Sequence, residues 1–168
     1  MKNLIAVFAL MTLVFLACEN AKPDQEQTTK TETPKGWDDF KAAFVNTISK
    51  NDMGGLVEIA ALPLKGNFFS SENGTLSKAG LIKNYAKVFG GDVRLRIIKA
   101  QPEEWGEATI TNAAEAERIG VPKGAKVKTL QLNYVFNEGK DNQTESTQIF
   151  YFAKLDGKYK WCSMFIAG

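Results

Sequence analysis

The sequence predicts an α+β domain in which three N-terminal helices and a short hairpin pack on a curved antiparallel meander of four strands. Three observations lead to this fold class. Apolar residues recur at helical spacing in the first half of the domain, and they alternate with polar residues in the second half. The pair Gly90-Gly91 separates the two patterns, because glycine commonly ends a helix.

The chain opens with a basic residue, Lys2, followed by an apolar run from Leu4 to Ala17. This run is shorter than the ~20 residues that span a bilayer, and it fits the apolar region of a secretory signal. The junction Phe15-Leu16-Ala17-Cys18 resembles the lipobox of bacterial lipoproteins. That resemblance implies cleavage after Ala17 and a diacylglycerol membrane anchor on the Cys18 sulfur. An ordinary signal with a chance cysteine is the alternative.

Residues 18–35 are expected to form a disordered linker, because they are rich in Thr, Gln, Lys and Glu and lack large apolar side chains. The lipoprotein resemblance places the protein in the bacterial cell envelope. Glu19 after the cysteine is compatible with sorting to the outer membrane. The choice between periplasmic and surface-exposed display stays open.

The folded domain is expected to occupy residues 36–168 and to begin with a helix from Trp37 to Lys50. Asp52 is the expected N-cap of a second helix that ends near Ala60, and Ser77 that of a third helix that ends at Gly90. The turn residues between the second and third helices predict an irregular hairpin over 64–75. The expected apolar face of the third helix is Leu81, Ile82, Tyr85, Val88 and Phe89.

Four strands are expected over 93–99, 127–136, 144–154 and 159–166. The first rests on the alternation of Val93, Leu95 and Ile97 with two arginines, and Asp156-Gly157 predicts a tight turn between the last two. Residues 101–126 fit neither period. They form an insert with Trp105, Ile110 and a short helical run from Ala113 to Arg118.

The last strand predicts cover on both faces of the sheet. Strict alternation would place Tyr159, Trp161, Ser163 and Phe165 on one side, and the other side would be mostly apolar as well. Either the insert folds over the second face or a second copy of the protein covers it. The insert carries many glutamates, so the sequence favours a homodimer.

Composition excludes several classes of function. The chain has no histidine, which removes histidine-based catalytic units and the usual zinc sites, so no metal or other cofactor is expected. Without Lys2 the formal charge falls from +2 to +1, which gives no general attraction to nucleic acid. Cys162 is left without a disulfide partner if Cys18 carries lipid.

The domain resembles the nuclear transport factor 2-like superfamily, whose cone-shaped fold is shared with steroid isomerases and scytalone dehydratase. The residues that carry the resemblance are Trp37-Asp38-Asp39-Phe40, Asn51-Asp52, Leu62-Pro63, the third helix and Asp156-Gly157-Lys158-Tyr159. The isomerases' Tyr and Asp fall on Phe44 or Val45 and on Phe68 or Phe69. These side chains cannot transfer a proton, so the resemblance implies no isomerase chemistry.

Two sets of residues are candidates for binding. Five aromatic side chains either fill the cone or line an apolar small-molecule pocket in it: Phe44, Phe68, Tyr85, Tyr134 and Trp161. Basic side chains on two expected strands form either a solvated sheet face or a patch for anionic groups: Arg94, Arg96, Lys99, Lys126 and Lys128.

The leading hypothesis is therefore a lipid-anchored envelope protein that acts as a small-molecule-binding or protein-interaction module rather than as an enzyme. The alternatives are a lyase- or hydrolase-type enzyme that uses Tyr or carboxylates in the cone, and a structural subunit of an envelope complex.

Overall fold

The computed structural model describes residue 34, residues 36–67 and residues 74–168. Every described residue belongs to the unit Thr33–Gly168, one of the two units into which the chain divides. The signal segment, Cys18 and Phe68 therefore lie outside the described residues. Within the described part of the chain, no helix has the length and apolar character needed to cross a membrane.

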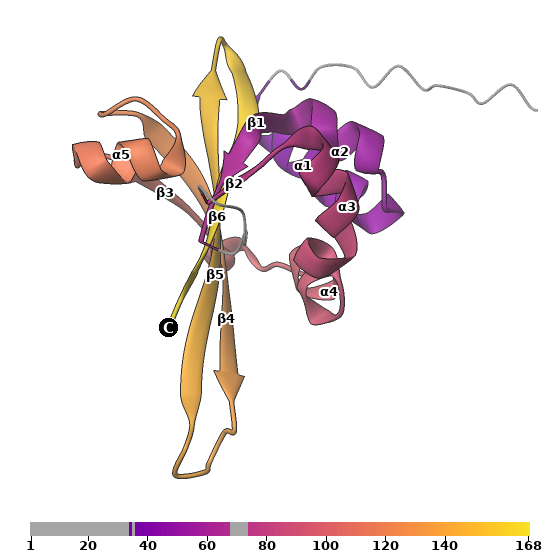
Figure 1. Ribbon diagram of the computed structural model, residues 1–168, viewed down its shortest axis with the longest axis vertical. Helices are drawn as coiled ribbons and strands as arrows, with labels where there is room; N and C mark the ends of the chain where they lie inside the picture. Colours follow the sequence, from indigo (N-terminus) through magenta and orange to yellow (C-terminus); the bar gives the residue numbers. More distant parts are fainter. Residues whose placement is uncertain (1–33, 35, 68–73) are drawn as a thin grey trace, which may run out of the picture. The chain divides into compact units, whose positions relative to one another are not determined.

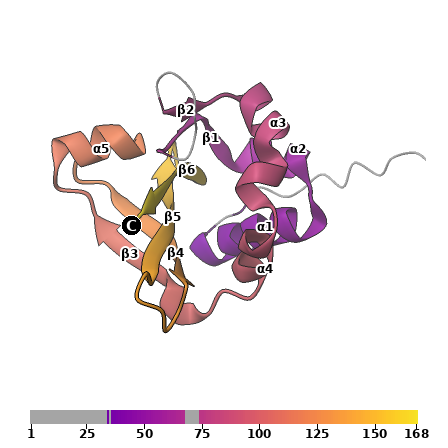
Figure 2. The ribbon, with the colours of Figure 1, turned by 60° about the horizontal axis from the view of Figure 1, so that its bottom comes forward.

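The unit Thr33–Gly168 is an α+β fold built on one curved, mixed sheet of six strands in the order β2-β1-β6-β5-β4-β3. Neighbouring strands are antiparallel except β1 and β6, which are parallel. The helices α1 to α4 lie on one side of the sheet and α5 lies on the other (Figures 1 and 2). The α-helices are α1 Trp37–Lys50, α2 Met53–Ile59, α3 Lys78–Phe89, α4 Asp92–Ile98 and α5 Ala113–Ile119. The strands are β1 Ala60–Lys65, β2 Thr75–Leu76, β3 Trp105–Thr109, β4 Lys126–Phe136, β5 Thr144–Leu155 and β6 Lys158–Ala167.

The first three helices form where the sequence predicts them. Helix α1 buries Phe40, Phe44 and Ile48 along one face. The Asp52 side chain accepts a hydrogen bond from the Gly55 amide at 2.8 Å and caps α2, and Ser77 caps α3 through the Gly80 amide at 3.1 Å. These side chains satisfy amides that the first helical turn leaves without a partner.

The expected strand over 93–99 is wrong, because these residues form helix α4. Gly91 has a φ of +55°, and a Cβ on Gly90 would lie 2.0 Å from the Ala86 carbonyl oxygen, so the glycine pair turns the chain sharply after α3. Asp92 then occupies the first turn of α4, where the helix dipole favours negative charge. Val93 and Ile97, four residues apart, face the helical layer, and Leu95 is left 54% exposed.

The detail of three helices on a four-strand meander is also wrong, since the described residues form five α-helices and six strands. The insert contributes β3, which pairs with β4 from Trp105 opposite Leu130 to Thr109 opposite Lys126. Four of the five β3 residues are exposed, so the strand has no apolar alternation to reveal it. The expected helical run becomes α5, capped by the Asn112 side chain.

Strand β6 contains a bulge that changes which side chains share a face. Phe152 pairs with Trp161 and Tyr151 pairs with Ser163, so Cys162 is the extra residue. Strict alternation along β6 is therefore wrong after Trp161. Beyond the bulge, Met164 joins Trp161 on the helical side, and Phe165 joins Cys162 on the side of α5.

Two apolar clusters result, one on each side of the sheet. The inner cluster lies between the sheet and α1 to α4, and Phe44, Phe89, Phe150, Phe152 and Trp161 lie at its centre. The outer cluster lies between the sheet and α5, and its members include Ile110, Ile119, Val127, Tyr151, Cys162 and Phe165. The insert thus covers the second face of β6, through Ile110 but not through Trp105, which packs on the inner cluster.

Among the described residues, a side chain rather than a strand pairs with the end of β6 beyond β1. Strand β1 runs beside β6 only as far as the pairing of Lys65 with Ser163. Beyond it, Asn67 donates from Nδ2 to the Ile166 carbonyl oxygen at 2.6 Å and accepts from the Ile166 amide at 2.7 Å. The Asn67 amide group therefore makes the two hydrogen bonds that a neighbouring strand would make.

Candidate functional site

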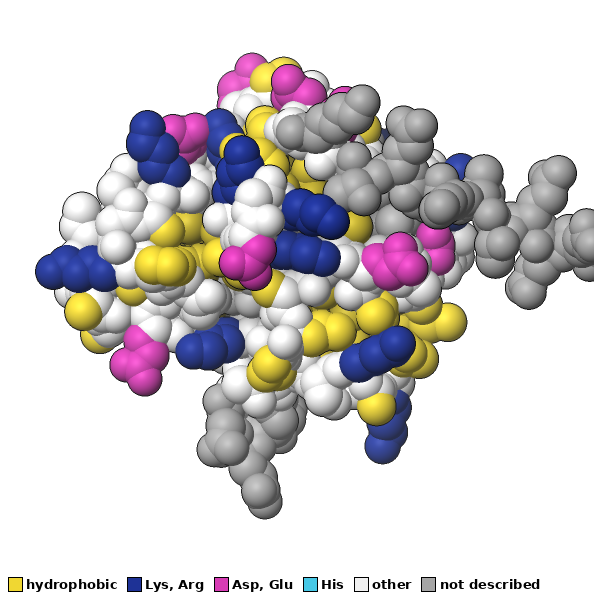
Figure 3. All heavy atoms as spheres, turned by 90° about the horizontal axis from the view of Figure 1, so that it is seen from above, with side chains coloured by type: hydrophobic (Ala, Val, Ile, Leu, Met, Phe, Trp, Pro, Cys, Tyr) yellow, Lys and Arg dark blue, Asp and Glu magenta, His cyan; other side chains and the backbone are white. Residues whose placement is uncertain are grey.

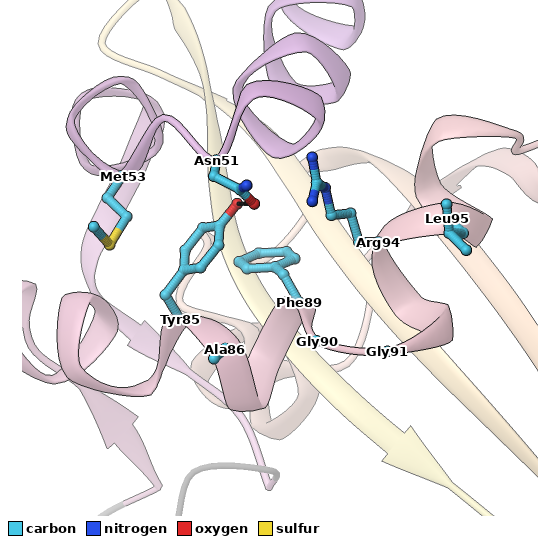
Figure 4. A pocket seen from close by; sticks show the side chains of 9 residues that line it. All are labelled: Asn51, Met53, Tyr85, Ala86, Phe89, Gly90, Gly91, Arg94 and Leu95. Atoms are coloured by element: carbon cyan, nitrogen blue, oxygen red, sulfur yellow. Dashed lines mark hydrogen bonds between the residues drawn. The ribbon is translucent and has the colours of Figure 1, made fainter.

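A cleft of about 480 Å³ opens in the helical layer, where the end of α1 meets α2, α3 and α4 (Figure 4). The Gly90-Gly91 turn joins α3 to α4, and both glycines line the cleft. Apolar side chains form most of its wall, with three polar side chains among them. Its lining residues are Asn51, Met53, Tyr85, Ala86, Phe89, Gly90, Gly91, Arg94 and Leu95.

Tyr85 and Asn51 form the first polar group of the cleft. The Tyr85 hydroxyl lies 3.5 Å from the Asn51 Oδ1 and 3.5 Å from the Ile48 carbonyl oxygen. Figure 4 shows the Tyr85 ring extending from α3 towards Asn51. Both hydrogen bonds are long and therefore weak. The Tyr85 hydroxyl can donate to a better-placed acceptor on a ligand without losing a strong contact.

Arg94 forms the second polar group. Its Nη2 donates to the Ser49 carbonyl oxygen at 2.5 Å, which holds the side chain against the end of α1. Its Nε is buried and has no hydrogen-bond partner among the described residues. A buried guanidinium N–H without an acceptor is uncommon in folded proteins, and here it belongs to a side chain that lines the cleft.

Burial raises the pKa of Tyr85 above its usual value; the nearby Arg94 charge lowers it and the Asp52 carboxylate raises it, both by smaller amounts. At neutral pH the hydroxyl therefore keeps its proton and can donate a hydrogen bond. Tyr85 and Arg94 are both donors, so the cleft is suited to a ligand that presents acceptor oxygens.

The structure divides the five aromatic residues that were candidates for a cone pocket. Phe44 and Trp161 are fully buried in the inner cluster, with their ring centroids 6.1 Å apart, and they pack edge-on. Only Tyr85 lines the cleft, next to the ring of Phe89, at a centroid distance of 5.2 Å. Tyr134 lies on β4, and Phe68 lies outside the described residues.

Tyr134 belongs to a separate polar group on β4. Its hydroxyl lies 3.4 Å from the Gln148 Oε1, and the Arg96 guanidinium lies over its ring at 4.4 Å. Burial raises the pKa of Tyr134, and the Arg96 charge opposes this rise. Gln148 is itself buried and donates to the Met164 sulfur at 2.8 Å. These contacts hold Tyr134 in place but do not bring it to the Tyr85 cleft.

The five basic residues that were candidates for a patch do not share two strands. Arg94 and Arg96 lie on α4, with Lys99 at its C-terminal end, and Lys126 and Lys128 lie on β4. Arg96 pairs with Glu104 at 3.6 Å, and Lys128 pairs with Glu107. On the face shown in Figure 3, basic and acidic side chains are interspersed. The basic patch stays a prediction, but the strand over 93–99 from which it was predicted is a helix.

Of the nine residues that line the cleft, the sequence singles out only Tyr85 and Arg94 as site candidates, and the seven that it misses include Asn51, Met53 and Leu95. Leu95 was assigned to a sheet face because its segment alternates, and Asn51 was read only as a helix break. Asn51 has a φ of +54° and ends α1 in the left-handed conformation. The sequence marks the end of α1, the start of α2 and the Gly90-Gly91 pair. Only the fold shows that all three lie next to Tyr85.

Two further clefts lie away from Tyr85. One, of about 490 Å³, runs between α1 and Trp105, where the Lys41 Nζ lies 4.5 Å from the indole centroid. The other, of about 500 Å³, lies between β1 and α5 and reaches Cys162. Burial raises the pKa of the Cys162 thiol to about 11, so this group is not a reactive thiolate at neutral pH. The described residues contain no cluster of three or more Cys, Asp or Glu side chains that could hold a metal ion.

Comparison with known proteins gives distant structural similarities only. No family model matches the chain, and no curated protein matches it. A nuclear transport factor 2-like protein with a cystatin-like fold from Novosphingobium aromaticivorans is 12% identical, with a TM-score of 0.38 over 99% of this chain and 90% of that chain. A nuclear transport factor 2-like protein of unknown function from Shewanella oneidensis is 7% identical, with a TM-score of 0.34 over 77% and 93%. One from Burkholderia xenovorans is 12% identical, with a TM-score of 0.34 over 76% and 85%.

Proposed function

We propose that this protein is a binding module of the cell envelope whose cleft at Tyr85 takes a small molecule with an apolar body and an acceptor or anionic group. Met53, Phe89 and Leu95 would contact the apolar body, and Arg94 and Tyr85 would donate to the polar end. Small-molecule sites commonly combine an apolar wall with a few fixed polar groups in this way.

One observation carries this proposal: the buried Nε of Arg94 has no acceptor among the described residues. A buried charged donor is costly unless it makes its hydrogen bond, and a bound carboxylate or phosphate oxygen would complete it. The hydrogen bond from Nη2 to Ser49 already fixes the guanidinium, so little side-chain freedom would be lost on binding.

The same residues favour binding over catalysis. None of the described residues that line the cleft is acidic, and the raised pKa of Tyr85 makes its hydroxyl a poor base at neutral pH. An enzyme in this cleft would need a proton acceptor from elsewhere. The proposal therefore assigns Tyr85 and Arg94 to ligand orientation.

The experiment is native mass spectrometry of the protein purified from its own host, followed by titration of any retained small molecule. Arg94→Lys keeps the charge but removes Nε, and we expect it to weaken binding about 10-fold or more, the cost of a lost hydrogen bond to a charged group. Arg118→Lys on α5 makes the same chemical change far from the cleft and should leave binding unchanged. Equal affinity of both variants would contradict the role of Arg94.

We also propose that the protein is anchored by lipid on Cys18, at the end of a signal segment formed by residues 1–17. The sequence Leu16-Ala17-Cys18 supports this proposal, and two acyl chains give stable membrane attachment where one chain gives only marginal binding. In cells fed a labelled fatty acid, Cys18→Ser should abolish labelling and release the protein from membranes. Cys162→Ser is the control, because this thiol is buried. Labelling that survives Cys18→Ser would refute the anchor.

The order of elements supports a nuclear transport factor 2-like domain as the scaffold of this site. The residues that carried the resemblance have the expected local structures. Trp37 opens α1, Asp52 caps α2 after the Asn51 break, and Asp156 and Gly157 join β5 to β6 with positive φ angles. Leu62-Pro63 lies in β1 and has a cis peptide bond.

A further inference from the structure

Helices α3 and α4, which border the cleft, carry an excess of positive charge. From Lys78 to Lys99 the chain has six basic residues and one acidic residue, Asp92, which is a formal charge of +5 against +2 for the whole chain. Glu104 offsets Arg96, and Asp52 stands at the start of α2 near Tyr85. The remaining charge is concentrated on α3 and on the end of α4.

The exposed rows of these helices alternate basic and apolar side chains. On α3, Ile82 is 43% exposed and lies beside Lys83, with Lys78 one turn before it. On α4, Leu95 is 54% exposed, and Lys99 follows it by one turn. A single exposed apolar side chain is ordinary on a protein surface, but exposed apolar side chains that lie together with polar residues around them mark interaction sites.

The apolar side chains gather at the mouth of the cleft. Leu95 and Met53 line it, and Met53 is 42% exposed. Ala86, one turn after Ile82 on the same row of α3, lines it as well. The exposed apolar side chains at the cleft and the lysines next to them along α3 and at the end of α4 make up a surface that we call the α3–α4 face: Met53, Ile82, Lys83, Lys87, Leu95 and Lys99.

We propose that the α3–α4 face docks on an anionic lipid bilayer, with the mouth of the cleft turned towards the membrane. Lysines would lie among the anionic head groups, and Met53, Ile82 and Leu95 would reach the boundary of the acyl chains. Basic side chains around exposed apolar ones are the arrangement that binds the interface of an anionic membrane. Charge complementarity with the lipid head groups selects this partner.

The test uses the unit Thr33–Gly168, whose two apolar clusters lie wholly within it, and lipid vesicles in a sedimentation assay. Vesicles of phosphatidylcholine with about a third phosphatidylglycerol should bind the protein, while pure phosphatidylcholine should not, and added salt should weaken binding. Binding to both kinds of vesicle with equal strength would overturn the proposal, as would no binding to either.

Matched variants locate the binding surface. Because each lysine near an anionic surface changes the partition coefficient about 5-fold, Lys83→Gln with Lys99→Gln should lower it about 30-fold. Lys154→Gln with Lys158→Gln makes the same change of net charge at the exposed β5–β6 turn and should have less than about a twofold effect. Equal losses in the two pairs would show that net charge alone drives binding and would overturn the proposal.

A second pair tests the apolar rim. Leu95→Ser should weaken vesicle binding several-fold, whereas Val135→Ser on β4, also exposed, should not. Equal effects of these two variants would show that the mouth of the cleft does not face the membrane and would overturn that part of the proposal. Thermal unfolding of each variant checks that it folds, and the single change Lys83→Gln replaces the pair if the pair does not. Vesicle binding does not depend on the acceptor for Arg94, so the small-molecule proposal can fail while this one stands.

Discussion

The two sides of the sheet differ in the side chains that pack on them and in the helices that cover them. The inner cluster has 17 buried apolar residues, among them Trp161 and several phenylalanines, and four helices cover it. The outer cluster has nine, mostly Ile, Val and Ala, and the seven-residue helix α5 with its flanking turns covers it. The inner side obtains its packing from large rings on long elements, and the outer side obtains it from small side chains on a short one.

This difference shows how a polar segment can still serve as a cover. Helix α5 exposes Glu117 and leaves Glu115 half-buried while it buries Ala116 and Ile119, so its glutamates do not determine which face it packs on the sheet. Arg118 lies over the Phe165 ring at 4.3 Å and extends this cover. The sequence favoured a homodimer because the second face of β6 needed a cover, and α5 with its flanking turns supplies that cover. The homodimer stays a prediction, which light scattering at micromolar concentration would test.

The largest expected effect is on the inner side. Phe44→Ala removes a fully buried ring that contacts Phe150, Phe152 and Trp161, and we expect it to lower the free energy of unfolding by about 3–5 kcal/mol. Phe136→Ala is the control, because Phe136 is 51% exposed, and it should cost less than about 1 kcal/mol. Denaturant titration measures both. Similar losses would mean that the inner cluster is not the main core.

A smaller effect is expected on the outer side. Ile119→Ala should cost about 2–3 kcal/mol, the low end for a buried isoleucine, since a short surface helix can settle into part of the space left behind. Ile82→Ala on α3 makes the same deletion at a side chain that is 43% exposed and should have little effect. An Ile119→Ala variant as stable as the parent would show that α5 does not cover the sheet in solution.

The third prediction concerns alkaline pH and again the outer side. Burial raises the pKa of Cys162 from 9.0 to about 11, so the unfolded chain loses this proton first as the pH rises. Stability due to this group is complete below pH 9 and is lost between pH 9 and 11, by about 2 kcal/mol. Cys162→Ala should flatten this part of the stability profile measured by denaturant titration. Burial also raises the pKa of Tyr85, Tyr134 and Tyr151, which leaves a slope above pH 10 in the variant. An unchanged slope between pH 9 and 10 would exclude Cys162 as its source.

The sequence predicted the elements whose pattern is long or whose ends are marked. Helix α1 has four turns of one apolar face, α2 and α3 have capping side chains, and β4 to β6 are each ten or more residues long, with the Asp156-Gly157 turn between the last two. Residues 93–97 were mistaken for a strand because five residues of alternation also fit a helix that buries the first and the fifth. The bulge at Cys162 has no sequence signal of its own, because it depends on which residue of β5 lies opposite.

The candidate site was less predictable than the fold. Tyr85 was identified, but its partners come from the ends of three helices, and their meeting is set by the Gly90-Gly91 turn and by packing. The Arg94 Nε is buried and has no hydrogen-bond partner in the part of the chain that the structure describes, and no local sequence pattern reveals such burial. Residues from different helices that line one cleft are recognised only when the arrangement of the helices is known.

The hydrogen bonds between Asn67 and Ile166 bear on how the protein avoids self-association through its strands. An unpaired sheet edge is a template on which another chain can add a strand, and this is a common route to aggregation. Beyond the end of β1, the Asn67 amide occupies both backbone groups of Ile166, so an incoming chain finds no free donor or acceptor at that residue. A single side chain thus keeps this part of the sheet from growing into a larger one.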